Sequence, residues 1–206
     1  MIVVTCFHGA VALSFLTYPL LHQLGAHSFH LLDILACSGI LSKVPYLGNI
    51  LAPRPALHHM YASPTLVVGT ILCIVGCVVR VAAYGALGQF FTFELALKDG
   101  HKLITHGPFA FVRHPAYTGL LLVKIGMVLS DFGQGSWWYA VTALKSWPSV
   151  GCIQLMAAMY ITEPIFCLIL MMTRMPKEDR ILREAFGEQW VEWAKRVPYR
   201  ILPGIY

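Results

Sequence analysis

The chain has 206 residues, of which 57% are hydrophobic and only 12% are charged. An ordinary soluble domain is about 25% charged, so this composition, with a mean hydropathy of +0.66, indicates a membrane protein. The net charge of +5 does not indicate a nucleic-acid partner, because the basic residues follow the ends of the apolar runs. The length suits a single domain over residues 1–206.

The N-terminal part, residues 1–63, is expected to be a variable region with one or two spans. Residues 2–24 form an apolar run without a basic leader or a cleavage motif, which predicts a retained transmembrane helix. Residues 28–51 are hydrophobic but interrupted by charges, Pro and Gly. They are compatible with a second span, a re-entrant segment or a lumenal loop.

Three further apolar runs, at 65–85, 118–133 and 150–173, predict three more spans. The expected fold is therefore an all-α, polytopic bundle of about four or five transmembrane helices. Residues 64–206 are expected to form its core. A polar island at 86–117 separates the first two of these runs.

The basic residues predict which side of the membrane the polar segments occupy. Of the 15 Lys and Arg residues, three lie in the island at 86–117 and seven in the tail at 173–206. Two spans separate these segments, so both lie on one side, and the positive-inside rule makes that side cytosolic. The tail is expected to be an amphipathic helix opened by Pro176, with Trp190 and Trp193 as membrane-interface anchors.

The most distinctive segment is 101–119, HKLITHGPFAFVRHPAYTG. Pro115 suits the first turn of a helix, where its missing N–H costs nothing. Arg113 and His114 would then stand at the N-terminus of that helix, beside backbone N–H groups suited to anions and polar ligands. This pattern predicts a binding site at the membrane surface.

Charged residues also occur at the end of the last predicted span and inside the spans. Arg174, Glu178 and Asp179 come where the last span leaves the lipid. Lys124 and Glu163 are intramembrane charges, which usually face a cavity or each other. They either line a tunnel for a lipid tail or form a structural pair, and we favour the pair.

Two separated signatures in this order resemble the isoprenylcysteine carboxyl methyltransferase family of integral membrane, S-adenosylmethionine-dependent enzymes. The first signature is His-x-Leu-Ile-x-x-Gly-Pro-Phe at 101–109, which runs into Arg-His-Pro-x-Tyr-x-Gly at 113–119. The second is Arg-x-x-x-Glu-Asp at 174–179, followed by Phe-Gly at 186–187 and Val-Pro at 197–198. The resemblance covers about residues 64–206. The Arg-His-Pro element alone is shared with phospholipid N-methyltransferases, so it indicates the class of enzyme, whereas the pair of signatures is specific.

The resemblance implies which residues contact the cofactor and the substrate. The cofactor set is Glu94, His101, Lys102, Leu103, Ile104, Phe109, Arg113, His114, Pro115, Ala116, Tyr117 and Glu178. Phe109 stands where Tyr is frequent in the family, so any hydroxyl contact there is lost. Arg174 would face the substrate, and Arg174 and Glu178 would be the catalytic residues. The chain has no glycine-rich dinucleotide fingerprint, so the cofactor site is not a Rossmann crevice, and no metal is expected.

The implied reaction is methyl esterification of the C-terminal carboxylate of a farnesyl- or geranylgeranyl-cysteine in CaaX-processed proteins. The family places it in the endoplasmic reticulum membrane, with the active site facing the cytosol. A carboxylate with a pKa of roughly 3.5 is ionised at neutral pH and needs no general base. Arg174 can hold that carboxylate, and Glu178 can complement the positive charge of the cofactor.

Two other functions are compatible with the residues. A phospholipid or small-amine N-methyltransferase would need a base near the methyl group and would give Arg174 no electrostatic purpose. A non-enzymatic membrane scaffold would show no saturable cofactor binding and would tolerate changes at His114 and Glu178.

Overall fold

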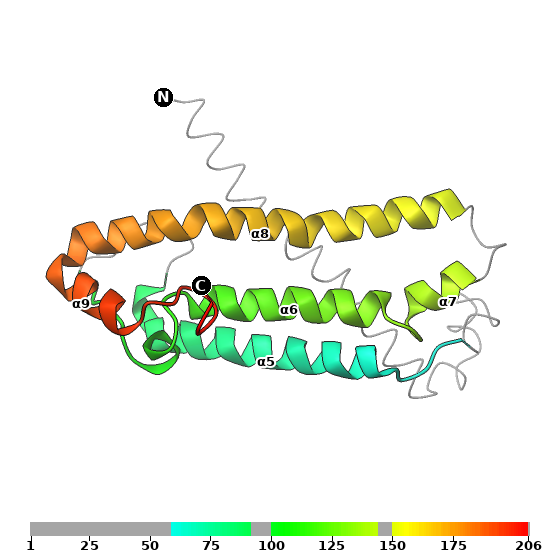
Figure 1. The fold of residues 1–206 in the computed structure, drawn as a ribbon, viewed down its shortest axis with the longest axis horizontal. Helices are drawn as coiled ribbons and strands as arrows, with labels where there is room; N and C mark the ends of the chain where they lie inside the picture. The colour runs from blue at the N-terminus through cyan, green and yellow to red at the C-terminus, as the bar shows by residue number, and fades with distance from the viewer. Residues whose placement is uncertain (1–58, 92–99, 144–149, 206) are drawn as a thin grey trace, which may run out of the picture. The chain divides into compact units, whose positions relative to one another are not determined.

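The computed structural model describes residues 59–91, 100–143 and 150–205 (Figure 1). Every regular element in these ranges is a helix, and no strand occurs among them, which confirms the all-α prediction for this part of the chain. The expected span at 2–24, the ambiguous region at 28–51 and the candidate cofactor residue Glu94 lie outside the described residues.

The chain divides into two compact units. The first combines residues 1–67 with 129–150 and holds the short helix α7, Trp137–Ala143. The second combines 68–128 with 151–206. The candidate site residues that the structure describes all belong to the second unit.

Among the described residues, two helices are long and apolar enough to cross a membrane. Helix α5 is Pro64–Leu87 and helix α6 is Pro115–Phe132. With the short segments that continue them, the candidate spans run Pro64–Phe90 and Pro115–Ala140. They coincide with the apolar runs on either side of the polar island, and α6 begins at the proline that the sequence marked as its first residue.

Small residues bring α5 and α6 close together in the second unit. A Cβ added to Gly76 would lie 2.5 Å from the carbonyl oxygen of Gly119, and one added to Gly119 would lie 2.5 Å from that of Gly76. Two turns further along, a Cβ on Gly126 would lie 2.6 Å from the Gly69 carbonyl oxygen. The glycine that ends the Arg-His-Pro-x-Tyr-x-Gly signature is therefore required by the contact with α5.

Replacing Gly119 by Val is expected to destabilise the folded protein by about 1–3 kcal/mol or more, because the added side chain overlaps the α5 backbone. Thermal unfolding in detergent would measure the loss. Gly85→Val, on the partner helix α5, is the matched control, because a Cβ there meets nothing within 4 Å. Equal unfolding temperatures for the two variants would contradict the close approach.

Helix α8, Val150–Phe186, corrects the expectation that Pro176 opens a separate tail helix. Pro176 lies inside α8 on its exposed side. On a neighbouring face of the helix, Met171, Met175 and Asp179 are spaced by four residues and are 4%, 0% and 6% exposed. Packing along this stripe holds the helix together although proline removes one backbone hydrogen bond.

The helical tail breaks at Gly187. Gly187 has φ +51°, and α9, Glu188–Arg196, starts directly after it. Trp193 of α9 is only 2% exposed and donates its indole N–H to the carbonyl oxygen of Phe109 at 3.2 Å. The assignment of Trp193 as a membrane anchor is therefore wrong, since its ring packs with Ala83 and Phe109 inside the second unit.

Lys124 of α6 and Glu163 of α8 form an ion pair between the helices. The ammonium nitrogen lies 2.7 Å from both carboxylate oxygens, and the side chains are 9% and 16% exposed. The pairing predicted from the sequence is confirmed, and it ties α6 to α8.

Breaking this pair on one side is expected to cost about 3–5 kcal/mol, because the remaining charge is left buried without its partner. Lys124→Met and Glu163→Gln should each lower the unfolding temperature strongly in detergent. The double variant should recover much of the loss, which a double-mutant cycle would show as a coupling free energy. Additive losses would mean that the pair does not join the two helices energetically.

Candidate functional site

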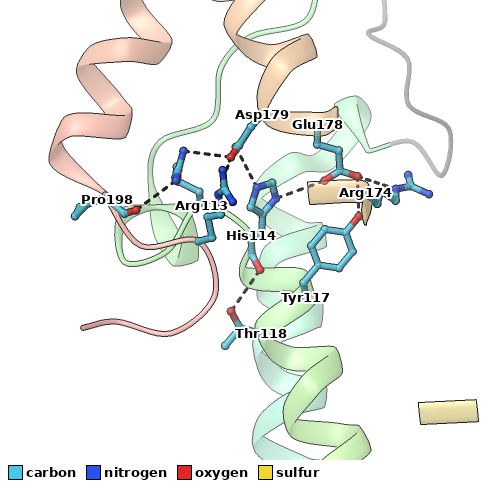
Figure 2. Close-up of polar contacts among 9 residues, drawn as sticks. Arg113, His114, Tyr117, Thr118, Arg174, Glu178, Asp179 and Pro198 are labelled. Carbon is cyan, nitrogen blue, oxygen red and sulfur yellow. Dashed lines mark hydrogen bonds and ion pairs between the residues drawn. The ribbon is translucent and has the colours of Figure 1, made fainter. Parts of the chain in front are cut away.

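His114 lies at the centre of a polar cluster at the N-terminus of α6 (Figure 2). Its side chain is 6% exposed, and each ring nitrogen faces a carboxylate of α8. Nε2 lies 3.1 Å from Asp179 Oδ1, and Nδ1 lies 3.4 Å from Glu178 Oε2. The structure thus brings together the two signatures that the sequence separates by about 60 residues.

Glu178 receives several donors at one carboxylate. The hydroxyl of Tyr117 donates to Oε1 at 2.7 Å, and Nε of Arg174 donates to the same oxygen at 2.8 Å (Figure 2). Burial alone would raise the pKa of this carboxyl, but hydrogen bonds from His114, Arg174 and Tyr117 lower it below its ordinary value. Glu178 is therefore a carboxylate at neutral pH.

Asp179 is the second anionic centre and is 6% exposed. Besides the contact with His114, its Oδ2 lies 3.2 Å from Arg113 Nη1 and accepts a hydrogen bond from Arg200 Nε at 3.1 Å. Burial would raise the pKa of Asp179, but the His114 hydrogen bond and the charges of His114, Arg113 and Arg200 lower it. Three side chains from two other segments therefore converge on this one carboxylate.

The charge state of His114 follows from its two carboxylate neighbours. Burial alone would lower the pKa of the ring, but hydrogen bonds to Asp179 and Glu178 raise it above its ordinary value. Stabilisation from the charged ring is therefore complete below the ordinary histidine pKa of about 6.5 and is lost as the pH rises through the raised value.

The segment after α9 forms a backbone lining for the site. The amide of Arg113 donates to the carbonyl oxygen of Tyr199 at 2.9 Å, and that of His114 to the carbonyl oxygen of Arg200 at 2.8 Å. The hydroxyl of Thr118 donates to the carbonyl oxygen of Ile201 at 2.7 Å. The sequence analysis missed these contacts, and it missed the contribution of Arg200 to the site. The only hint was the Val-Pro element just before this segment.

The remaining predicted cofactor residues divide into three groups. The ring of His101 lies beside those of Phe90 and Phe186, with centroids 4.9 and 6.0 Å apart. Phe109 is buried, and Leu103, Ile104 and Ala116 pack against the same core cluster. Pro115 is fully buried, whereas Lys102 is exposed. Among these residues, His101 is the one whose ring contacts other aromatic rings.

The charged side chains of this site carry a net positive charge. Glu178 and Asp179 contribute two negative charges, and Arg113, Arg174 and Arg200 contribute three positive ones, before His114 is counted. Such a site can bind an anion beside a cationic group. In the described ranges, no group of three or more His, Cys, Asp or Glu residues could hold a metal ion.

Comparisons with known proteins point to one family. The model of the isoprenylcysteine carboxyl methyltransferase (ICMT) family matches residues 68–147. A probable protein-S-isoprenylcysteine O-methyltransferase of Oryza sativa subsp. indica is 30% identical over an alignment that covers 80% of this chain and 79% of that protein. Protein-S-isoprenylcysteine O-methyltransferase B of Arabidopsis thaliana is 26% identical over 79% of this chain and 71% of its own length.

A relative with another name also matches. The Delta(14)-sterol reductase of Methylotuvimicrobium alcaliphilum is 24% identical over an alignment that covers 97% of this chain but 48% of that protein. The match to the rice protein is the stronger one, because its identity is higher and it covers most of both chains.

Proposed function

Because the chain belongs to the isoprenylcysteine carboxyl methyltransferase family, we propose that it methylates the C-terminal carboxylate of a prenylated cysteine, using S-adenosylmethionine. The observation that carries the proposal is the contact of Glu178 with Arg174, Tyr117 and His114. An ionised carboxylate beside an arginine can complement a cationic methyl donor and an anionic acceptor in one place.

The residues of the site fit the parts of S-adenosylmethionine. Glu178 can complement the positive charge of the sulfonium and ammonium groups. The neighbouring rings of Phe90, His101 and Phe186 offer aromatic surface for an adenine. When bound, this cofactor supplies an electrophilic methyl group on a sulfonium sulfur.

The protein's own part in the reaction is orientation and charge. The substrate carboxylate is already ionised at neutral pH, so no residue has to remove a proton. Arg174 would hold that carboxylate through guanidinium N–H groups, and its position is fixed by the hydrogen bond to Glu178. Holding the reacting groups in line lowers the entropic part of the barrier.

The apolar helices suit a lipid-modified substrate. We expect the farnesyl or geranylgeranyl chain to stay in the bilayer while the cysteine carboxylate reaches the polar cluster at the start of α6. The bundle would have four or five spans in the endoplasmic reticulum membrane. The cluster would then face the cytosol, where both the cofactor and the prenylated protein C-termini are accessible.

The proposal is tested by incubating the full-length protein in detergent or membranes with methyl-labelled S-adenosylmethionine and N-acetyl-S-farnesylcysteine. We expect a labelled product whose methyl group is released by base, as an ester is. Phosphatidylethanolamine offered in parallel should stay unlabelled. Label on the amine instead would identify an N-methyltransferase. A complete absence of saturable cofactor binding would overturn the enzyme assignment.

A further inference from the structure

Asp179 is the most highly connected buried charge among the described residues, yet nothing in the proposed chemistry requires it to touch the cofactor or the substrate. Its Oδ1 faces His114, and its Oδ2 faces both Arg113 and Arg200. These partners come from the loop before α6 and from the segment after α9. Asp179 therefore joins three parts of the second unit at one point.

His114 has no ring nitrogen left over for another partner. Nε2 faces Asp179 at 3.1 Å and Nδ1 faces Glu178 at 3.4 Å, and both facing atoms are carboxylate oxygens. A neutral imidazole would turn a lone pair toward one of these oxygens, whereas an imidazolium donates to both. Two facing carboxylates therefore favour the doubly protonated ring.

From this geometry we propose that Asp179 is a positioning residue. Together with Arg113, Arg200 and the backbone of residues 199–201, it forms a clasp that holds His114 in place. His114 in turn holds Glu178 in place. The clasp itself stands on the contacts above. Only its last consequence, that Glu178 is held for the methyl donor, rests on the proposed function.

The backbone contacts explain how the parts of the clasp are held in position. The amides of Arg113 and His114 donate to the carbonyl oxygens of Tyr199 and Arg200, and a guanidinium N–H of Arg113 donates to that of Pro198 at 3.3 Å. These bonds place the Arg200 side chain beside Asp179. The end of the chain thereby becomes part of the site, although no predicted cofactor contact lies there.

The charged and titratable groups around His114 set the direction of a pH effect. Glu178 and Asp179 of α8 face the ring directly, and the ring of Tyr117 lies 5.7 Å from it. Arg113 and Arg200 act on it through Asp179, and Arg174 through Glu178. Removing the Asp179 charge leaves the arginines in place, so the ring should lose its second proton at a lower pH. Removing Arg200 should have the opposite effect.

The test is NMR of the ring nitrogens in full-length protein labelled with ¹⁵N-histidine in detergent, with His114→Gln used to assign the signal. In the wild type His114 should remain an imidazolium at pH 7. In Asp179→Asn its titration midpoint should fall by about one pH unit or more, and in Arg200→Gln it should rise. Glu184→Gln, an exposed carboxylate on α8, should leave the midpoint where it is.

The alkaline limb of kcat/KM for ester formation should move in the same directions as the NMR midpoint. A neutral ring in the wild type, or identical midpoints in all variants, would overturn the clasp. If Asp179→Asn does not fold, the opposite shift in Arg200→Gln decides the matter by itself. Shifted midpoints in a protein that forms no ester would leave the clasp standing and refute the proposed function.

Discussion

Glu178→Gln is expected to lower kcat/KM for ester formation by about 100-fold, which corresponds to about 2.7 kcal/mol. The amide is nearly isosteric but carries no charge. Tyr117, Arg174 and His114 all direct donors at this carboxylate, and the amide can satisfy only some of them. The negative charge that would complement the cofactor is lost as well, so the dissociation constant for S-adenosylmethionine should rise.

Steady-state kinetics and equilibrium cofactor binding on the same preparation would measure both effects. Glu184→Gln lies on the same helix and is exposed, so it should behave as the wild type. A thermal unfolding scan separates loss of the site from loss of the fold. Wild-type kinetics and cofactor affinity in folded Glu178→Gln would remove this carboxylate from the site.

Arg174→Ala is expected to reduce kcat/KM for the prenylcysteine carboxylate by about 100-fold while leaving cofactor binding less affected. Arg174 lies at the end of the apolar part of α8, and its Nε is bonded to Glu178. Removing the guanidinium takes away the group proposed to orient the substrate. Arg174→Lys should recover only part of the activity, because a lysine has no planar fork of donors.

Initial rates at varied substrate and varied cofactor would show which constant changes. Arg183→Ala, which removes an exposed arginine from the same helix, controls for the general loss of positive charge. Unchanged ester formation by Arg174→Ala would exclude a substrate-binding role. An equally large loss of cofactor affinity would reassign Arg174 to the cofactor.

Much of the helical framework could be predicted because it depends on signals that are local in the sequence. The apolar runs gave α5 and α6, and Pro115 marked the start of α6 because proline fits only the first turn of an undistorted helix. The two predicted spans between the island and the tail put both segments on one side of the membrane, which is why Glu178 could be expected near His114.

The errors and omissions come from long-range packing. Pro176 is a strong local signal for a helix start. Helix α8 nevertheless continues past it, because Met171 and Met175 are buried along one stripe of the helix. Trp193 has an amphipathic context, yet it is buried against a loop more than 80 residues earlier. The approach of Gly119 to Gly76 depends on the docking of two helices. The seven-residue spacing of Gly69 and Gly76, and of Gly119 and Gly126, was a signal for this contact that the sequence analysis missed.

Several members of the polar cluster were predicted from the sequence, but the contacts between them were not. The residue types of the two signatures identified the members His114, Arg174 and Glu178. The sequence could not show that His114 uses both ring nitrogens on α8 or that Arg200 reaches Asp179. Those contacts depend on where the last segment of the chain folds back, and a motif carries no information on that path.

The most direct measurement is ultraviolet cross-linking of labelled S-adenosylmethionine to the full-length protein, followed by mapping of the labelled peptide. The account predicts label within 101–117 or 174–179, lost when unlabelled cofactor competes and strongly reduced in Glu178→Gln. Competable label confined to other segments would contradict the central claim that the cluster around His114 and Glu178 is the site of methyl transfer.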